Sequence, residues 1–202
     1  MDETINNGEN LEEKEKKDPK PSKGSTVLTI ILIIMCVILA VTAYLNTFVF
    51  FLVEVSGDSM LPTLHTGDVV TVNRNQTASV GDIVIIEGEK KDAYIIKRVI
   101  ATSGDTVSIE GGAVLVNGKE IDEPYLEKEN CTAPMGKKSK WTLKEGEIFF
   151  LGDNRINSKD SRDDAYGPCT EEQIVGVVED WSLKTISVNK FFYELGRKRN
   201  GV

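Results

Sequence analysis

A long uncharged stretch near the N-terminus limits the topologies that this chain can adopt. No Asp, Glu, Lys or Arg occurs between Val27 and Val53, and Ile, Leu and Val dominate the part from Val27 to Leu45. About 20 apolar residues are needed for a helix to span the hydrocarbon core of a bilayer. We therefore expect one transmembrane helix over residues 25–47. The aromatic and β-branched remainder, Phe48 to Val55, is expected to be the first strand of the following domain.

Lysines on the N-terminal side of this helix predict its orientation. No Lys or Arg follows the apolar run until Arg74, whereas five lysines precede it: Lys14, Lys16, Lys17, Lys20 and Lys23. Because cationic flanks stay in the cytoplasm, we expect residues 1–24 to be a disordered cytoplasmic tail and the rest to lie outside the cell membrane. A cleavable signal peptide is the alternative, with small residues at Val41-Thr42-Ala43. Its apolar region is usually only about 7–15 residues long, so the run's length favours an anchor.

Composition narrows the function of the remaining chain. The 202 residues carry a net charge of −8 and a single histidine, His65. The negative charge argues against nucleic acid as a partner, and one histidine excludes a multi-histidine metal site. Cys36 lies in the apolar run, while Cys131 and Cys169 lie in the expected extracytoplasmic part. These two can pair or remain free thiols, and the sequence leaves both outcomes open.

The chain after the helix is predicted to be mainly β. Turn signals such as Asn117-Gly118, which favours a two-residue hairpin, separate short runs of β-branched residues. The expected strands are 69–72, 83–86, 93–100, 106–109, 113–116, 147–151 and 174–178. Their number and spacing favour an antiparallel sheet with barrel-like closure.

These patterns set the expected domain limits. A catalytic β domain is expected over residues 48–186, and its polar stretch 122–146 is expected to be a surface excursion or small subdomain. Residues 187–202 mix aromatic and basic side chains and are expected to form a C-terminal tail. That tail is either frayed or in contact with the membrane surface.

A serine in a glycine-containing turn is the candidate nucleophile. Ser59 closely follows the expected first strand, and Gly57 permits unusual backbone angles beside it. The N–H of Ser59 is a candidate donor to an oxyanion, and losing one such donor costs roughly 3–4 kcal/mol. A serine hydroxyl also needs a base to remove its proton. His65 is one candidate base, but the sequence shows no acidic partner that would orient it.

Lys97 is the other candidate base. On a strand it shares a face with Ile95 and Val99, where burial would disfavour its charged form and lower its pKa. An ordinary lysine pKa of about 10.4 is too high for a base at neutral pH, whereas a value near 7–8 is suitable. An isolated lysine more often extends to the sheet edge, so this assignment depends on the other motifs. One of them, Asp153 to Arg162, is a dense polar segment that lacks the glycine and glutamate positions of a calcium loop.

Four motifs together resemble those of bacterial type I signal peptidases, in the short form of the Gram-positive branch. They are Ser56-Gly57-Asp58-Ser59-Met60-Leu61-Pro62-Thr63, Gly81-Asp82-Ile83-Val84, Lys97 to Ile100 followed by Gly104-Asp105, and Gly152 to Arg162. The similarity extends from the apolar run to about Trp181. It implies the signal peptidase fold and a membrane-bound serine endopeptidase of family S26. Such an enzyme cleaves N-terminal signal peptides from secreted preproteins after small residues of the Ala-x-Ala type.

The resemblance implies no metal and no cofactor. Its implied partners are secretory preproteins and membrane lipid, with no nucleic acid, and we expect a monomer. Ser59 matches the nucleophile, Lys97 the general base, and Ser158 the hydroxyl that orients the lysine. Gly57 falls where some relatives carry a serine that contributes its hydroxyl to the oxyanion hole, so here that donor is either a backbone group or absent. Ala101-Thr102-Ser103 departs from the more usual Gly-Leu-Pro.

The resemblance also assigns supporting residues. Asp160 with Arg162 matches one ion pair, and Asp153 with Arg98 a second. Apolar residues near the dyad are expected to form shallow pockets for small side chains: Val53, Val55, Met60, Leu64, Val70, Ile95 and Ile96.

Two other classes of function are compatible with parts of the chain. A self-cleaving repressor-type protease shares a Ser/Lys dyad, but the apolar span and acidic charge argue against its DNA-binding module and cytosolic location. A non-catalytic membrane-anchored β module that binds peptides or assembles an export complex predicts that a serine-acylating inhibitor does not label Ser59.

Overall fold

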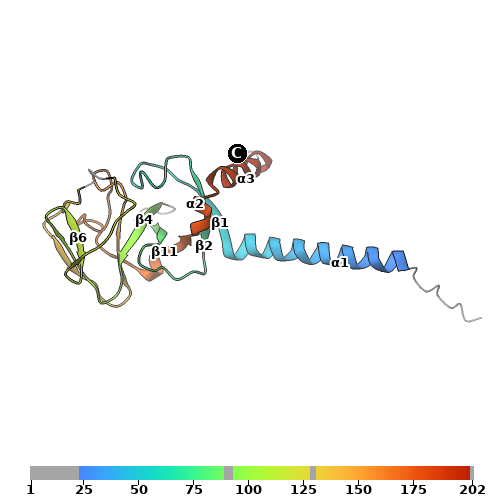
Figure 1. Ribbon diagram of the computed structural model, residues 1–202, viewed down its shortest axis with the longest axis horizontal. Coiled ribbons are helices and arrows are strands. Elements are labelled where there is room, and N and C mark those ends of the chain that lie inside the picture. The colour runs from blue at the N-terminus through green and yellow to red at the C-terminus, as the bar shows by residue number, and fades with distance from the viewer. Residues whose placement is uncertain (1–22, 89–92, 128–130, 201–202) are drawn as a thin grey trace, which may run out of the picture. The chain divides into compact units, whose positions relative to one another are not determined.

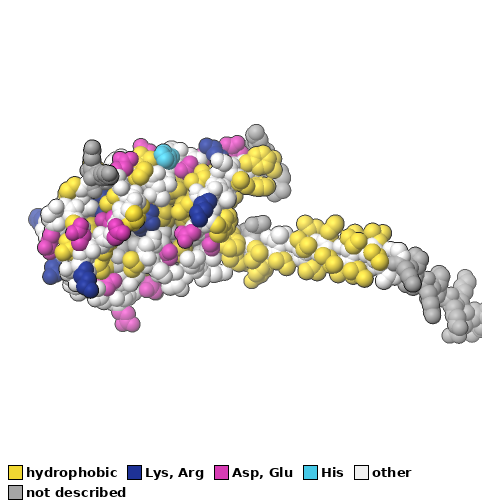
Figure 2. Space-filling view, viewed as in Figure 1, with side chains coloured by type: hydrophobic (Ala, Val, Ile, Leu, Met, Phe, Trp, Pro, Cys, Tyr) yellow, Lys and Arg dark blue, Asp and Glu magenta, His cyan; other side chains and the backbone are white. Residues whose placement is uncertain are grey.

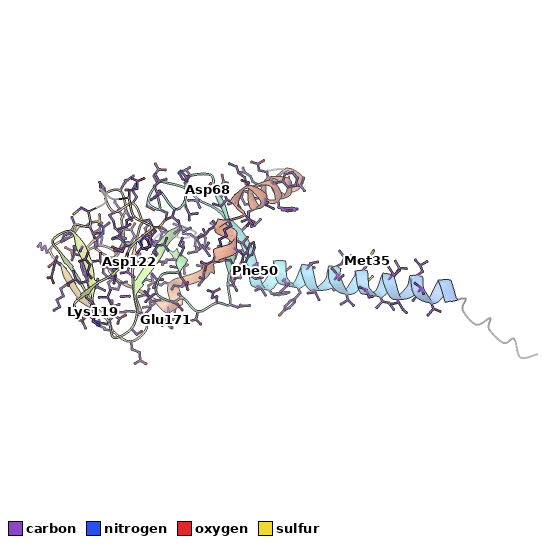
Figure 3. All side chains as sticks on the ribbon, viewed as in Figure 1. Met35, Phe50, Asp68, Lys119, Asp122 and Glu171 are labelled. Carbon is purple, nitrogen blue, oxygen red and sulfur yellow. The ribbon has the colours of Figure 1, made fainter. Side chains whose placement is uncertain are left out.

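The computed structural model describes residues 23–88, 93–127 and 131–200, so nearly all of the expected cytoplasmic tail lies outside the described residues. The chain divides into two units, residues 1–42 and 43–202. Helix α1 (Lys23–Tyr44) exposes its apolar side chains along its length, as at Met35 (Figure 3), and a short π-helical turn, Leu45–Val49, follows it. The helical stretch Thr26–Val49 has a mean hydropathy of 2.9 and is long and apolar enough to cross a membrane. The predicted N-terminal apolar helix is confirmed, and it is the only one of this length and hydropathy among the described residues.

Two antiparallel sheets form the second unit (Figure 1). The larger has the strand order β1-β2-β11-β3-β4-β9-β10, and the smaller has the order β7-β6-β5-β8. The larger sheet consists of β1 (Phe50–Glu54), β2 (Val69–Asn73), β11 (Ile174–Val178), β3 (Ile83–Glu87), β4 (Tyr94–Ala101), β9 (Glu147–Leu151) and β10 (Cys169–Thr170). The smaller consists of β7 (Lys119–Glu120), β6 (Ala113–Val116), β5 (Thr106–Glu110) and β8 (Lys140–Thr142). The mainly β, antiparallel fold class is therefore confirmed.

The hairpin signal at Asn117-Gly118 is also confirmed. Val116 of β6 pairs directly with Lys119 of β7, so the loop has two residues. Both have positive φ, 53° at Asn117 and 77° at Gly118. A type I′ turn requires this geometry, and it suits the twist of the flanking strands.

Strand β4 is covered on both faces, and this determines the environment of Lys97. Ile96 packs into a core cluster with Val55 and Ile85, whereas Val99 packs into a different cluster with Phe150. A third cluster, in which Trp141 and Phe149 stack with ring centroids 4.9 Å apart, joins the two sheets. Apolar clusters therefore lie against both faces of β4 near Lys97.

Two segments contain more structure than the sequence indicated. Within 122–146, β8 pairs with β5, and Thr132, Trp141 and Leu143 are buried, so this stretch is only partly a surface excursion. Short helix α2 (Asp180–Leu183) precedes helix α3 (Ile186–Asn200), which makes the expected tail helical through Asn200. Helix α3 packs on the sheet through buried Asn189, whose side-chain amide donates to the Val69 carbonyl at 3.2 Å.

Gly176 offers a test of the sheet packing. A Cβ there would lie 2.6 Å from the Asn73 carbonyl oxygen and 2.7 Å from Cγ1 of Val72. Because β11 and β2 cannot separate without disturbing the core, we expect Gly176→Ala to lower the free energy of unfolding by about 1–3 kcal/mol. Denaturant unfolding of the detergent-solubilised protein measures it.

Gly196→Ala is the matched control. No atom lies within 4 Å of a Cβ at Gly196, which occupies helix α3. Alanine is the better helix former, so this variant should be as stable as wild type or slightly more so. Equal losses in the two variants would contradict the packing argument.

Candidate active site

Ser59 and Lys97 lie in direct contact. Nζ of Lys97, on β4, is 2.7 Å from Oγ of Ser59, which lies in the turn after β1. The same nitrogen donates to the backbone carbonyl of Ile96 at 2.9 Å. Lys97 is only 4% exposed, although lysine ammonium groups usually lie in solvent.

Burial sets the proton affinity of this amine. It lowers the pKa of Lys97 from 10.5 to about 8, against the attraction of the Asp160 and Asp153 carboxylates, which favour the charged form. With a pKa of about 8, roughly a tenth of the amine is unprotonated at pH 7, and in that form it can accept the proton of the Ser59 hydroxyl.

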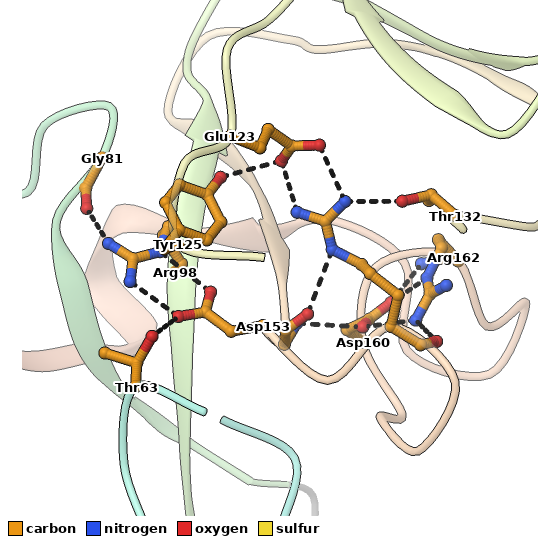
Figure 4. Close-up of polar contacts among 11 residues, drawn as sticks. Thr63, Gly81, Arg98, Glu123, Tyr125, Thr132, Asp153, Asp160 and Arg162 are labelled. Atoms are coloured by element: carbon orange, nitrogen blue, oxygen red, sulfur yellow. Dashed lines mark hydrogen bonds and ion pairs between the residues drawn. The ribbon is translucent and has the colours of Figure 1, made fainter. Parts of the chain in front are cut away.

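Each of the two carboxylates has its own arginine (Figure 4). Asp153 accepts from Nε and Nη2 of Arg98 at 2.9 and 2.6 Å, and Asp160 accepts from Nε and Nη2 of Arg162 at 2.7 and 2.9 Å. Both carboxylates are fully buried. The pairing matters because a bare buried carboxylate beside Lys97 would hold the lysine in its charged form.

The polar loop after β9 also fixes the nucleophile's turn. The backbone N–H of Asn154 donates to the Ser59 carbonyl at 3.0 Å, and its side-chain amide donates to the Asp58 carbonyl at 3.0 Å. Thr63, at the far end of the turn, donates its hydroxyl to Asp153. The Ser59 turn is therefore attached at both ends to the loop whose Asp153 binds Arg98, the neighbour of Lys97 on β4.

Ser158 lies close to the Ser59 turn but makes no hydrogen bond to Lys97. Its buried hydroxyl makes no hydrogen bond with any described residue. A Cβ on Gly152 would come within 2.2 Å of this hydroxyl oxygen and 2.5 Å of the Ser59 carbonyl. Gly152 thus permits the two segments to approach closely, and the hydrogen bond to Lys97 implied by the resemblance is not formed in this structure.

A third arginine, Arg155, belongs to the network, and no sequence pattern predicts a role for it. Arg155 donates to the Glu123 carboxylate through both terminal nitrogens, to the Thr132 hydroxyl at 2.6 Å, and to the Gly152 carbonyl at 3.1 Å (Figure 4). Tyr125 donates its hydroxyl to Glu123 at 2.8 Å and places its ring 3.9 Å from the Arg98 guanidinium. Arg155 lies inside a recognised motif, but no local signal placed Glu123 opposite it.

The remaining candidates lie away from the dyad. His65 has an exposed side chain whose Nδ1 is 3.8 Å from Asp68, and it makes no contact with Ser59. Cys131 is exposed and Cys169 is buried, and neither forms a disulfide. No cluster of three or more His, Cys, Asp or Glu side chains is arranged for a metal ion within the part of the chain that the structure describes.

A groove of about 310 Å³ opens beside the dyad. It is lined by Val53 to Ser56, Ser59, Ile85 and Tyr94 to Lys97. Strands β1 and β4 lie four places apart in the sheet order yet share this groove, so the sheet is strongly curved.

The expected pocket residues divide into two sets. Val53, Val55, Ile95 and Ile96 line the groove. Met60, Leu64 and Val70 are fully buried in the core cluster that also contains Val55 and Ile96, and they do not line it. The sequence marks all seven residues as apolar and near the dyad. The curvature of the sheet determines which of them face the groove and which are buried in the core.

The turn leaves the backbone N–H of Ser59 available. Gly57 has φ of +90°, a conformation that favours glycine. No hydrogen bond from the Ser59 N–H occurs among the described residues. A serine hydroxyl in contact with a buried lysine, in an apolar groove with a free backbone donor at the same serine, has the chemical groups that a serine peptidase requires.

Comparison with known proteins identifies the family. The model of the family described as signal peptidase, peptidase S26, matches residues 25–181. Signal peptidase I of Bacillus amyloliquefaciens is 39% identical over 151 residues, covering 68% of this chain and 76% of the relative. Signal peptidase I T of Bacillus subtilis (strain 168) is 39% identical over 139 residues, covering 64% and 72%. A signal peptidase I crystal structure from Enterococcus faecalis V583 aligns with a TM-score of 0.41 and 25% identity over 52% of this chain and 98% of that one.

The chain belongs to the type I signal peptidases of peptidase family S26 and is anchored in the membrane through its N-terminal helix.

Replacing Lys97 by methionine tests the cause of its lowered pKa. Between the folded pKa of about 8 and the ordinary 10.5, the unfolded chain binds more protons than the folded one. Stability therefore rises with pH in this window. Relative to Lys97→Met, the wild-type free energy of unfolding should increase by about 3 kcal/mol from pH 8 to 10.5.

The exposed lysine Lys140 on β8 provides the control. Lys140→Met removes an exposed lysine in the same way, so its unfolding free energy is compared with that of wild type at the same pH values. Chemical unfolding at several pH values measures both differences. A flat Lys97→Met difference would mean that burial does not lower the lysine pKa.

Removing Glu123 tests the third ion pair. Arg155 has no exposed side-chain area, so Glu123→Ala leaves a buried guanidinium without its carboxylate. We expect a loss of about 3–5 kcal/mol in the free energy of unfolding. Glu120→Ala, which removes an exposed carboxylate on β7, should change stability little when measured in the same denaturation series. Similar losses in both variants would show that Arg155 does not depend on its partner.

Proposed function

We propose that Ser59 and Lys97 are the nucleophile and general base with which this signal peptidase cleaves signal peptides from preproteins. The observation that carries the proposal is the 2.7 Å contact between Oγ and Nζ at a buried lysine. Contact and burial are both required, because a solvated amine would be protonated at neutral pH and a distant one would not reach the hydroxyl.

The reaction follows from this geometry. Unprotonated Lys97 takes the proton of the Ser59 hydroxyl as Oγ attacks the scissile carbonyl carbon. The resulting ammonium gives that proton to the leaving amine as the peptide C–N bond breaks and an ester to Ser59 remains. A water molecule, deprotonated by the regenerated amine, then hydrolyses the ester and releases the signal peptide.

The oxyanion is stabilised by the protein backbone. The Ser59 N–H is available, and Gly57 carries no side chain that could donate in its place. One such donor contributes roughly 3–4 kcal/mol to the transition state.

The groove explains a preference for small residues. An extended preprotein segment fits between β1 and β4, where alternate side chains point to the same wall. Four aliphatic side chains line the groove at this point: Val53, Val55, Ile95 and Ile96. Residues at −1 and −3 of the cleavage site therefore have room for alanine but not for larger side chains.

The lysine-rich segment before α1 supports an orientation with the N-terminus in the cytoplasm and the β domain outside. In this orientation the dyad meets signal peptides as they leave the bilayer. The enzyme acts as a monomer, since one chain supplies both members of the dyad and the groove.

Preprotein cleavage by the detergent-solubilised enzyme tests the assignment. Ser59→Ala and Lys97→Met should each abolish cleavage, and Ser139→Ala, at an exposed serine, should retain it. For wild type, kcat/KM should rise with pH and level off above about 8, because only the unprotonated lysine is active. Sequencing the new N-terminus tests for cleavage after Ala-x-Ala.

Two results would overturn the proposal. The first is normal turnover by either dyad variant. The second is a wild-type pH profile that shows no ionisation near 8, since the lysine would then not be the titrating base.

A further inference from the structure

Helix α3 exposes its apolar side chains to solvent, whereas a helix of a soluble domain usually buries them against the core. Val188, Phe191, Phe192 and Leu195 follow the spacing i, i+3, i+4, i+7, which gathers them into one stripe. Their exposed fractions are 53%, 63%, 59% and 56%. A soluble domain would normally turn such a stripe toward its own core.

The opposite face of α3 makes the contacts with the domain. Asn189 is buried and binds the Val69 carbonyl and the Ser182 hydroxyl, while Ile186 packs against a core cluster. Arg197 forms an ion pair with Glu54 of β1 at 3.5 Å. These contacts fix the rotation of the helix, so the stripe points outward (Figure 2).

The stripe lies close to the point where the chain leaves the membrane. The membrane-spanning stretch ends at Val49 and β1 begins at Phe50. An apolar hollow of about 650 Å³ between β1 and the C-terminal helices is lined by Phe50, Phe51, Leu52, Thr71, Trp181, Asn189 and Phe192. Trp181, on α2, is 49% exposed. The aromatic side chains of the C-terminal helices thus border the first residues after the bilayer.

Charge favours a lipid surface as the partner. Helix α3 carries four cations, Lys190, Arg197, Lys198 and Arg199, and one carboxylate, Glu194, in a chain whose net charge is −8. A basic helix with an aromatic and aliphatic stripe is typical of helices that lie in the membrane interface, where anionic headgroups attract the cations. The family match ends at residue 181, so α3 lies beyond the matched region.

We propose that α3 is an interfacial helix whose stripe, together with Trp181, inserts into the headgroup region of an anionic bilayer and gives the β domain a second membrane contact. The proposal does not depend on the catalytic dyad. Because Arg197 holds Glu54, which lines the substrate groove, the same helix links the lipid surface to the edge of that groove.

Tryptophan quenching by brominated lipid tests the contact directly. Full-length Ser59→Ala protein is placed in nanodiscs of phosphatidylglycerol and brominated phosphatidylcholine, so catalysis does not enter the measurement. Trp181→Phe identifies the Trp181 signal, since Trp141 is 7% exposed in the core and should be quenched little. We expect Trp181 to be quenched, and Phe191→Ser with Leu195→Ser to reduce that quenching at least about two-fold. Val80→Ser, at another exposed apolar residue, should leave it unchanged.

Three outcomes would overturn the proposal. One is equal Trp181 emission in brominated and ordinary lipid. Another is quenching that the double variant does not change. The third is Trp181 shielding that occurs only in discs with two copies, which would make the stripe an interface between copies. Far-UV circular dichroism of each variant confirms that it folds.

Discussion

The chemistry that we propose for this protein depends on the exclusion of water from one lysine amine. Lys97 projects from a strand covered on both faces, and burial lowers its pKa to about 8 even though Asp160 and Asp153 oppose the shift. The balance is sensitive to those carboxylates, because opposite charge favours an ammonium ion. By binding Asp160 and Asp153, Arg162 and Arg98 limit that attraction without exposing the lysine to solvent.

This solution requires an unusual amount of buried charge for a small domain. Desolvating an ion pair is costly and often offsets its attraction. The arginines each compensate by binding several groups: Arg98 binds Asp153 and the Gly81 carbonyl, and Arg162 binds Asp160 and the Arg155 and Ser158 carbonyls. The result is a loop whose backbone is fixed at many points. Asn154 then transfers that rigidity to the turn that carries Ser59.

The sequence predicts the parts of this structure that depend on local patterns. Alternating β-branched runs and turn signals located the longer strands but not β7, β8 and β10, and the Asn117-Gly118 turn predicted one register. The contact between Ser59 and Lys97 was predictable only from the four motifs taken together, because neither residue is distinctive by itself. The pairing of Arg155 with Glu123 was not predictable, because it depends on where a polar loop returns after leaving the sheet. Likewise, Met60, Leu64 and Val70 are apolar near the dyad, and only the curvature of the sheet buries them.

If Ser59 is the nucleophile, as we propose, the short connection from α1 limits which substrates can be cut. Ser59 follows Val49, the last residue of the apolar span, by only ten positions. Even a fully extended chain of that length covers roughly 35 Å, so the hydroxyl operates within a thin layer above the lipid. A scissile bond must enter this layer in an unfolded segment. Preproteins that fold before cleavage, or whose scissile bond lies far from the membrane, would not reach Ser59. The enzyme would therefore select substrates by the distance between the scissile bond and the membrane as well as by side-chain size.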